Sequence, residues 1–318
     1  MSNAARIPRD ARQRITNLKT PYLVSALAVV GSIACAAVPS ASAATNKNDT
    51  ASSANWSGYV AGAAQFSSIS GSWVEPSAKC SSGQGFSSFW VGLGGAGNQS
   101  QALEQVGTEV DCSATGSSSH KAWYELVPAA PVDLGLNISA GDHMTGKVTV
   151  NGTNVTVTLT DQTTGQSATK NLQMDNPDVS SAEWIAEAPS QCDGTGCQPL
   201  PLADFGNVSF TGASATANGH TGSISDSNWS AQAVELNGSS AGDGFISDTS
   251  SASAVPSNLS SDGSSFSVSW GSGGAQTATA GGTGSPTGGY GDGWGYGDGG
   301  GYAPYPGAWS DGSGASYW

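Results

Sequence analysis

Basic side chains are scarce in this sequence. Lys and Arg together number 10 among 318 residues, against 24 Asp and Glu, which gives a formal net charge of −14 at pH 7. Binding to nucleic acid depends on cationic side chains that neutralise phosphates, so nucleic acid is excluded as a partner. The self-repulsion of so acidic a chain fades as carboxylates take up protons toward pH 4. This composition suits a protein that works in acid, although solubility alone also favours it.

The N-terminal segment of the chain contains half of these basic residues. Five of them precede an apolar run from Tyr22 to Val38, which is followed by a small-residue site at Ala41-Ser42-Ala43. This order is typical of a signal peptide, and the run is too short and too rich in small residues for a permanent membrane anchor. We expect residues 1–43 to be removed and the protein to be secreted, with no membrane contact afterwards. The chain from Ala44 then carries five Lys and Arg against 23 Asp and Glu, a formal charge of −18.

Cysteine and histidine are also few. Four of the five cysteines follow the leader, an even number that favours two disulfides in an exported chain. Of three possible pairings we predict Cys80–Cys112 and Cys192–Cys197, because the glycines between the last two cysteines allow a tight loop. The three histidines are far from any paired-cysteine spacing, so no metal or cofactor is predicted. Cys35, within the leader, leaves a lipoprotein processing site as an alternative.

Long runs with apolar residues at helical spacing are missing from Asn55 to Trp270. Short alternating runs separated by turn residues take their place, which indicates an all-β domain. The clearest hairpin joins Lys147–Val150 to Val155–Leu159 through an Asn151-Gly152 turn. Similar runs predict strands at 89–93, 103–110, 121–127, 183–186, 208–211, 229–236 and 266–270. Many short strands in one domain of this size indicate a sandwich or barrel.

Aliphatic side chains nearly disappear after Trp270. Residues 271–318 contain 18 glycines in 48 positions and no Lys or Arg, so this Gly-rich C-terminal tail cannot bury enough surface to fold and is predicted to be disordered. Its eight Tyr and Trp side chains leave two interpretations open: a flexible tail with no specific partner, or adhesion to cell-surface polysaccharide.

Strand alternation predicts which side chains share a face. In the run at 89–93, Phe89, Val91 and Leu93 lie opposite Trp90, and in the run at 183–186 Glu183 lies opposite Trp184. If these strands belong to one curved sheet, the face away from the core forms a trough that suits an extended polymer. Its polar and aromatic residues are Trp90, Gln105, Glu109, Trp123, Glu125 and Glu183.

Six sequence blocks add a resemblance to this pattern. They are Asn55-Trp56-Ser57-Gly58-Tyr59, Trp90-Val91-Gly92-Leu93, Leu103-Glu104-Gln105-Val106-Gly107-Thr108, Ala122-Trp123-Tyr124-Glu125, Ala182-Glu183-Trp184-Ile185 and Ala203-Asp204-Phe205-Gly206-Asn207-Val208. In this order they resemble the signature blocks of the eqolisins, the glutamic endopeptidases, in their bacterial form. The resemblance covers about Asn55 to Leu236 and continues more weakly to Trp270.

The resemblance implies a two-sheet antiparallel β-sandwich with lectin-like, concanavalin-like topology. After a short segment at 44–54, residues 55–270 would form the peptidase domain, a monomer acting on polypeptide substrates. The catalytic glutamine of the family falls on Gln105 and its glutamate on Glu183. Its substrate-binding positions fall on Trp90, Glu109, Trp123 and Glu125.

These residue types suit peptide hydrolysis. A carboxylate can take a proton from the water that attacks the peptide carbonyl, and an amide N–H can stabilise the oxyanion, so neither metal nor covalent intermediate is required. Work in acid demands that Glu183 stay partly ionised near or below its reference pKa of about 4.3. We therefore expect the Gln105 amide to donate a hydrogen bond to the charged Glu183.

Three positions depart from the family pattern. Gly94 stands where many members have Asp, Val127 stands where a groove aromatic is usual, and Glu109 replaces the more usual Asp. The catalytic pair is intact, but substrate preference cannot be transferred from relatives.

Two other functions have partial support in the sequence. Gly238-Ser239-Ser240-Ala241-Gly242 matches the nucleophile-elbow pattern, but no helix pattern follows it and all three histidines precede it, contrary to the order in α/β-hydrolases. A glycan-acting or glycan-binding β-sandwich stays open as an alternative, since Glu125 and Glu183 could supply the two carboxylates that a glycosidase needs. Gln105 distinguishes the two interpretations, because a glycosidase has no evident use for it.

Overall fold

The computed structural model describes residues 50–81, 83–97, 100–193, 196–237 and 252–272. All of them belong to the compact unit Ala43–Trp318, while the other unit, Met1–Ser42, lies outside the described residues. None of the described residues is helical, so this part of the chain contains no helix that could span a membrane. The predicted leader, the Gly238–Gly242 segment and the tail from residue 273 also lie outside it. Gly271 and Ser272, predicted as the start of the disordered tail, instead belong to the last strand, Phe266–Ser272, because they pair with its neighbouring strand.

The described chain forms eighteen strands. The first nine are β1 (Ala51–Ser53), β2 (Trp56–Gly62), β3 (Phe66–Val74), β4 (Gly85–Gly94), β5 (Leu103–Cys112), β6 (Ser118–Val127), β7 (Val132–Asp133), β8 (His143–Asn151) and β9 (Asn154–Asp161). The others are β10 (Ser167–Gln173), β11 (Ala182–Glu187), β12 (Ser190–Asp193), β13 (Gly196–Pro199), β14 (Asn207–Ala217), β15 (His220–Gly222), β16 (Ser230–Asn237), β17 (Ala252–Pro256) and β18 (Phe266–Ser272).

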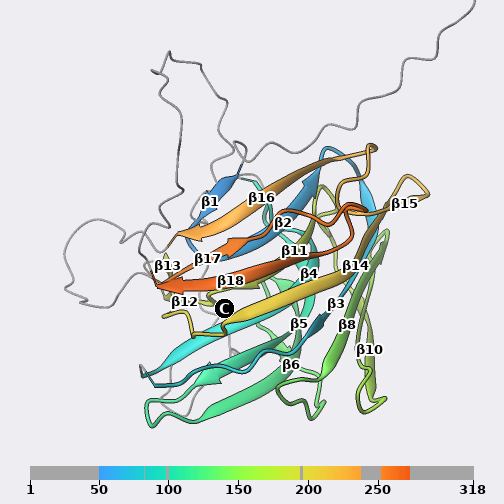
Figure 1. The fold of residues 1–318 in the computed structure, drawn as a ribbon. Coiled ribbons are helices and arrows are strands. Elements are labelled where there is room, and N and C mark those ends of the chain that lie inside the picture. Colours follow the sequence, from blue (N-terminus) through green and yellow to red (C-terminus); the bar gives the residue numbers. More distant parts are fainter. Residues whose placement is uncertain (1–49, 82, 98–99, 194–195, 238–251, 273–318) are drawn as a thin grey trace, which may run out of the picture. The chain divides into compact units, whose positions relative to one another are not determined.

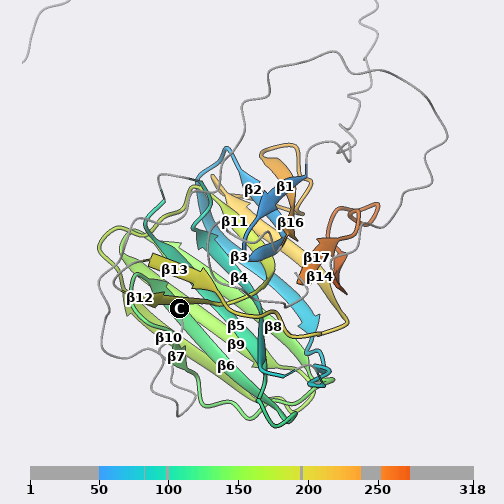
Figure 2. The same cartoon turned by 90° about the vertical axis from the view of Figure 1, so that its left-hand side faces the viewer.

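Sixteen of these strands form one hydrogen-bonded sheet that folds over into two layers. Along the sheet the order is β10-β9-β8-β3-β14-β18-β17-β16-β2-β11-β4-β5-β6-β7, so β10 and β7 are its two ends. Strands β4, β5 and β11 pack against β3, β8, β9 and β14, which makes the two layers of a sandwich (Figure 1). Figure 2 shows the same layers from the side, with β12 and β13 as a separate hairpin. The predicted all-β sandwich is confirmed.

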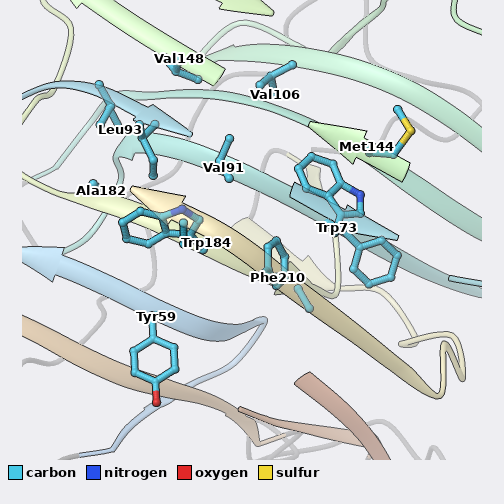
Figure 3. Close-up of a cluster of buried hydrophobic side chains, with 14 of the residues drawn as sticks. Tyr59, Trp73, Val91, Leu93, Val106, Met144, Val148, Ala182, Trp184 and Phe210 are labelled. Carbon is cyan, nitrogen blue, oxygen red and sulfur yellow. The ribbon is translucent and has the colours of Figure 1, made fainter. Parts of the chain in front are cut away.

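The two layers bury an apolar core between them. In β9, Val155, Val157 and Leu159 are buried, while the alternating threonines reach the outer surface. In β4, Val91 and Leu93 point into the same core, which Figure 3 shows in close-up. Each fully buried aliphatic side chain of this kind stabilises the fold by about 1.5–3 kcal/mol. The core therefore holds the two layers together through alternate residues of each strand.

The predicted strands are all present, most of them longer than the sequence patterns indicated. The β8–β9 hairpin is confirmed, but pairing continues to Asn151 and Asn154, so the turn consists of Gly152 and Thr153. Gly152 has φ +60°, which a hairpin turn with glycine at its first central position requires. The turn therefore begins one residue later than the Asn-Gly pair suggested.

The disulfide predicted between Cys80 and Cys112 is present, with 5.1 Å between the two Cα atoms. It joins the segment before β4 to the end of β5. In the β12–β13 hairpin the backbone register places Cys192 opposite Cys197, and Cys197 is disulfide-bonded. The side chain of Cys192 lies outside the described residues.

A buried polar network also ties the layers together. Glu75, which follows β3, is 1% exposed, and both of its carboxylate oxygens are hydrogen-bonded. Thr108 of β5 donates to one oxygen, and His120 Nδ1 of β6 lies 2.9 Å from the other. The indole of Trp73 donates to the Thr108 hydroxyl at 2.9 Å. Burial raises the pKa of Glu75, and the His120 and Thr108 hydrogen bonds oppose that rise.

Candidate active site

One cross-strand row brings the predicted catalytic residues onto the same face. Gln105 of β5 pairs with Gly92 of β4, and Gly92 pairs with Glu183 of β11. On the other side of Gln105 lies Glu125 of β6, and on the other side of Glu183 lies Val60 of β2. We call this face, which points away from the main core, the site face. Residues in register point to the same side of a sheet, so Gln105 and Glu183 face the same space.

Gly92 leaves a gap between the two side chains. With strands about 4.8 Å apart, the Cα atoms of Gln105 and Glu183 are separated by about 10 Å. A Cβ atom at Gly92 would lie 3.1 Å from the Gln105 Cβ and 2.9 Å from Leu103 Cδ1. Any larger residue at this position would therefore enter the space between the glutamine and the glutamate.

Gln105 is fixed by Glu125. Its Nε2 donates to Glu125 Oε2 at 2.5 Å, and its Oε1 is buried without a hydrogen-bond partner among the described residues. Both side chains are nearly inaccessible, with 4% of Gln105 and 5% of Glu125 exposed. Burial and, to a smaller extent, the nearby Glu187 charge raise the pKa of Glu125 to about 8, and the Gln105 amide opposes the rise.

Glu183 has the least favourable environment for a charge. It is 0% exposed, and neither carboxylate oxygen accepts a hydrogen bond from any described residue. Burial raises the pKa of Glu183 well above its usual value, and the charges of Asp178 and Glu104 raise it further. The nearby Ser181 hydroxyl opposes the rise without forming a hydrogen bond of normal geometry. The proton is therefore held strongly in the ligand-free site.

This arrangement corrects one expectation from the sequence. The Gln105 amide donates to Glu125 and not to Glu183, and the pKa of Glu183 is raised, not held near or below 4.3. The physical reason is the register of the strands: Glu125 is the direct neighbour of Gln105, while Gly92 separates Gln105 from Glu183. The complete burial of Glu183 then removes the solvent that would stabilise the carboxylate.

The predicted aromatic residues lie on the site face but are not open to solvent. Trp90 is 0% exposed and Trp123 is 5% exposed, in a second apolar cluster with Val60, Leu103, Ile185 and Val234. The trough predicted from the sequence is therefore more closed than expected, because the ring of Trp90 lies close to Gly92, which has no side chain. Trp123 Nε1 is buried without a partner among the described residues, so it is a free donor on this face. The substrate-binding roles of both residues remain predictions.

Glu109 is not grouped with the catalytic pair. It lies four residues along β5 from Gln105, about 13 Å at the spacing of an extended strand. Its carboxylate pairs with Lys121 Nζ at 2.8 Å, and the same ammonium lies 3.3 Å from Asp111. The structure thus places Glu109 at the far end of the site face, already neutralised by a cation. A contact with substrate there stays a prediction.

Sequence reasoning missed Glu187. Its two oxygens accept hydrogen bonds from Asn55 Nδ2 at 2.9 Å and Trp90 Nε1 at 2.7 Å, and the ring of Trp56 packs edge-on against Trp90 at 5.1 Å. Burial raises the pKa of Glu187 to about 7, and these donors oppose the rise. Strand alternation alone could have found it, because Glu187 is four residues after Glu183 and faces the same side. Asn55 and Trp56, quoted only as motif residues, hold this corner of the site.

No group of three or more His, Cys, Asp and Glu with the geometry of a metal site occurs in the part of the chain that the structure describes. The chemistry available on the site face is that of a carboxyl group and an amide across a glycine gap, with further carboxyl groups at Glu125 and Glu187. A carboxyl group can transfer protons, and an amide N–H can stabilise a developing negative charge.

Comparisons with known proteins agree with this chemistry. The model of the Peptidase A4 family matches residues 54–270. Aspergillopepsin-2 of Aspergillus niger is 33% identical over 201 residues, covering 55% of this chain and 68% of that protein. Scytalido-glutamic peptidase, solved with a peptide-based transition state analog, has a TM-score of 0.53 and 28% identity over 68% of this chain and 98% of its own. SCP-B, described as a member of the eqolisin family of peptidases in complex with the tripeptide Ala-Ile-His, has a TM-score of 0.51, 27% identity and the same coverage.

The relatives favour the peptidase interpretation over the glycan-acting alternative. The two solved relatives are named as peptidases, and each is covered along 98% of its length. The family match begins one residue before the first quoted block and ends at Trp270, as the resemblance implied. The chain therefore belongs to the Peptidase A4 family, the eqolisins, and is a glutamic endopeptidase.

Proposed function

We propose that this protein is a secreted acid endopeptidase that hydrolyses peptide bonds with a water molecule held between Glu183 and Gln105. The observation that carries this proposal is the shared row of Gln105, Gly92 and Glu183, in which two reactive side chains face one gap. On the far side of Glu183 the row continues with the apolar Val60. The Gln105 amide is therefore the polar group best placed to act together with Glu183.

The reaction follows from the two functional groups. Glu183 takes a proton from the water as its oxygen attacks the peptide carbonyl carbon, and a Gln105 N–H stabilises the oxyanion that forms. The carbon–nitrogen bond then breaks, and Glu183 gives its proton to the leaving nitrogen. A carboxylic acid and an amine are released, and Glu183 returns to its ionised form. The proposal needs neither a metal ion nor a covalent intermediate.

The raised pKa of Glu183 suits the first half of this cycle, in which the carboxylate takes a proton from water. A carboxyl group that binds its proton strongly is also a strong base once ionised, and a water molecule that donates to its free oxygens would stabilise the charged form. Glu125 holds the amide of Gln105 by one N–H, which leaves the other N–H for the oxyanion. The tight pairing with Glu125 therefore supports an oxyanion-binding role for Gln105.

Several buried carboxyl groups favour work in acid. The pKa values of Glu104 and Glu125 are raised to about 8, and those of Asp111 and Glu187 to about 7, in each case mainly by burial. At pH 3–5 these groups are protonated and carry no buried charge. The excess of acidic residues on the whole chain points the same way. We accordingly propose activity at about pH 3–5.

Secretion and a monomeric state belong to the same proposal. Secretion is supported by the sequence of the leader at residues 1–43, with its basic start, apolar run and small-residue site. Both interpretations of the tail, a flexible segment with no specific partner and adhesion to cell-surface polysaccharide, stay open, because residues 273–318 lie outside the described part of the chain.

The proposal is tested by measuring cleavage of a denatured protein from pH 2 to pH 8. Wild type, Gln105→Ala and Glu183→Gln should be compared in parallel. We expect activity with an acid optimum in the wild type and a loss of about 10³-fold or more in each variant, because each removes one of the two acting groups.

Circular dichroism of the variants provides the control for folding, since Glu183→Gln replaces a carboxyl group by an amide of the same shape. Persistent cleavage by both variants would rule out the proposed pair. Loss of wild-type activity on adding a chelator would also contradict the proposal.

A further inference from the structure

Two segments meet beside Glu183. One consists of the described residues 94–97 and 100–102, between β4 and β5, and the other is the segment at 178–181, which leads into β11. The backbone joins them directly, because Gly94 N–H donates to the Ser181 carbonyl at 3.1 Å. Ser181 is two residues before Glu183, so this junction helps to fix the position of the Glu183 backbone.

Asp178 lies at the centre of the junction. Its Oδ2 accepts a short hydrogen bond from the Ser100 hydroxyl, and its Oδ1 accepts the Ser180 N–H at 2.9 Å. Its own N–H donates to Glu104 Oε1 at 3.2 Å. Ser100 in turn accepts the Gly95 N–H at 2.9 Å, so the serine is itself held in place. Both oxygens of Asp178 thus act as hydrogen-bond acceptors.

Gly94 makes this close approach possible. Its φ is +81°, and a Cβ atom there would lie 2.6 Å from the Asp178 Cβ and 2.7 Å from the Asp178 carbonyl oxygen. Real Cβ atoms do not approach other atoms so closely, so a side chain at position 94 would push Asp178 away. The glycine that departs from the family pattern therefore provides the space in which an aspartate from another segment packs.

The charge of Asp178 acts on the glutamate. Two carboxyl groups, Asp178 and Glu104, disfavour ionisation of Glu183. Burial raises the pKa of Glu104 to about 8, so Glu104 is neutral in acid, and Asp178 is the other carboxyl group that acts on Glu183. The direct neighbours of Glu183 in its cross-strand row, Gly92 and Val60, carry no charge. The nearest carboxyl group in that row is Glu125, which lies beyond Gln105.

We propose that Asp178 is a positioning residue for Glu183: it fastens the segment at 178–181 to residues 94–97 and 100–102 and places a second carboxyl group near the catalytic glutamate. This inference rests on the proposed function of Glu183. It assigns the role to a residue outside the six sequence blocks that carry the family resemblance. The fastening and the charge are separable, because Ser100 contributes only to the first.

The test compares Asp178→Asn with Ser100→Ala in pH profiles of kcat/KM on a denatured protein. Asp178→Asn keeps hydrogen-bonding groups but removes the charge, so the acid limb of the profile should move to lower pH by about half a unit or more. Ser100→Ala keeps the charge and loosens the junction. It should raise KM or lower kcat about two- to fivefold without moving the acid limb.

An unchanged acid limb in Asp178→Asn would overturn the inference, and so would an equal shift in Ser100→Ala, because the effect would then come from geometry alone. Asp178→Ser serves as a second neutral variant, and if neither Asp178 variant folds the residue is a structural one and the inference fails. Glu183→Gln in the same experiment separates the two levels of the argument. If that variant stays active the proposed function fails, whereas an inactive Glu183→Gln with an unmoved Asp178→Asn profile contradicts only the role of Asp178.

Discussion

Glu75 and Glu183 are both buried glutamates, but their surroundings differ. Glu75 has a hydrogen-bond partner on each oxygen, Thr108 on one and His120 on the other, and it lies between the two layers of the sandwich. Neither oxygen of Glu183 has such a partner among the described residues, and it faces the gap at Gly92. Burying a carboxyl group without partners costs stability, so a protein keeps one only where it has another use. The comparison separates a carboxyl group that supports the fold from one that is available for chemistry.

The largest expected effect that tests this comparison is a loss of stability on removing the Glu75 carboxyl group. Glu75→Ala should lower the free energy of unfolding by about 3–5 kcal/mol, because it leaves Thr108 and His120 without their buried partner and opens a cavity. The measurement is guanidinium unfolding at pH 5, with Glu75→Gln as the milder control. The folded fraction should keep its kcat, in contrast to Glu183→Gln, which should retain stability and lose cleavage. If Glu75→Ala lost cleavage without losing stability, the two glutamates would not differ in the way proposed.

A somewhat smaller effect concerns pH. Glu104 and Glu125 ionise near 4.5 when exposed, but burial raises the pKa of each to about 8 in the folded protein. Between these values the folded state holds protons that the unfolded state has released, so stability is fully present below about pH 4.5 and is lost as pH rises toward 8. We expect a decrease of about 3 kcal/mol or more over this range.

Thermal unfolding at a series of pH values measures this loss, and Glu104→Gln should make the dependence shallower because its amide does not titrate. The burial of these carboxyl groups would be contradicted by stability that stays constant or rises from pH 4.5 to 8.

The smallest expected effect tests whether the gap at Gly92 is used in catalysis. In Gly92→Ala the new methyl group would contact Leu103, Gln105 and Trp90 at 2.9–3.1 Å. We expect a loss of stability of about 1–2 kcal/mol and a fall in kcat/KM of about tenfold, because the methyl group enters the space where water must lie. Gly62→Ala is a matched control on β2, since a Cβ there meets its nearest atom at 3.9 Å. Equal activity in the two variants would show that the gap is not used.

The fold was accessible from the sequence because its evidence is local. Alternation in the run at 89–93 assigned Phe89, Val91 and Leu93 to the core and Trp90 to the opposite face, and the structure has them there. The residues of the site were also brought together as predicted, at least for Gln105, Glu125 and Glu183. An alternating pattern predicts which side of a strand each residue faces. The family resemblance indicates that the strands carrying Gln105 and Glu183 contribute to the same site.

The hydrogen-bond partners and pKa shifts in the site could not be predicted from the sequence in the same way. That Gln105 donates to Glu125 depends on the register between β5 and β6, which no local pattern specifies. The raised pKa of Glu183 depends on packing by side chains from several strands, and Asp178 acts from an irregular segment whose path alternation cannot predict. Burial and hydrogen-bond partners are properties of the assembled sheet, so these features became visible only with the structure.

The order of strands in the sheet also bears on how molecules of this protein behave toward one another. At the proposed working pH the carboxyl groups lose charge, and with it the repulsion that keeps acidic proteins apart. The sheet ends at β7, which has two residues, and at β10, whose sequence Ser167–Gln173 carries Lys170 at its centre and has no fully buried position. A very short edge and a polar edge with a central lysine are poor templates for adding a strand from a second chain. The β10 end of the sheet is therefore a poor site for adding a strand under the conditions in which charge repulsion is weak.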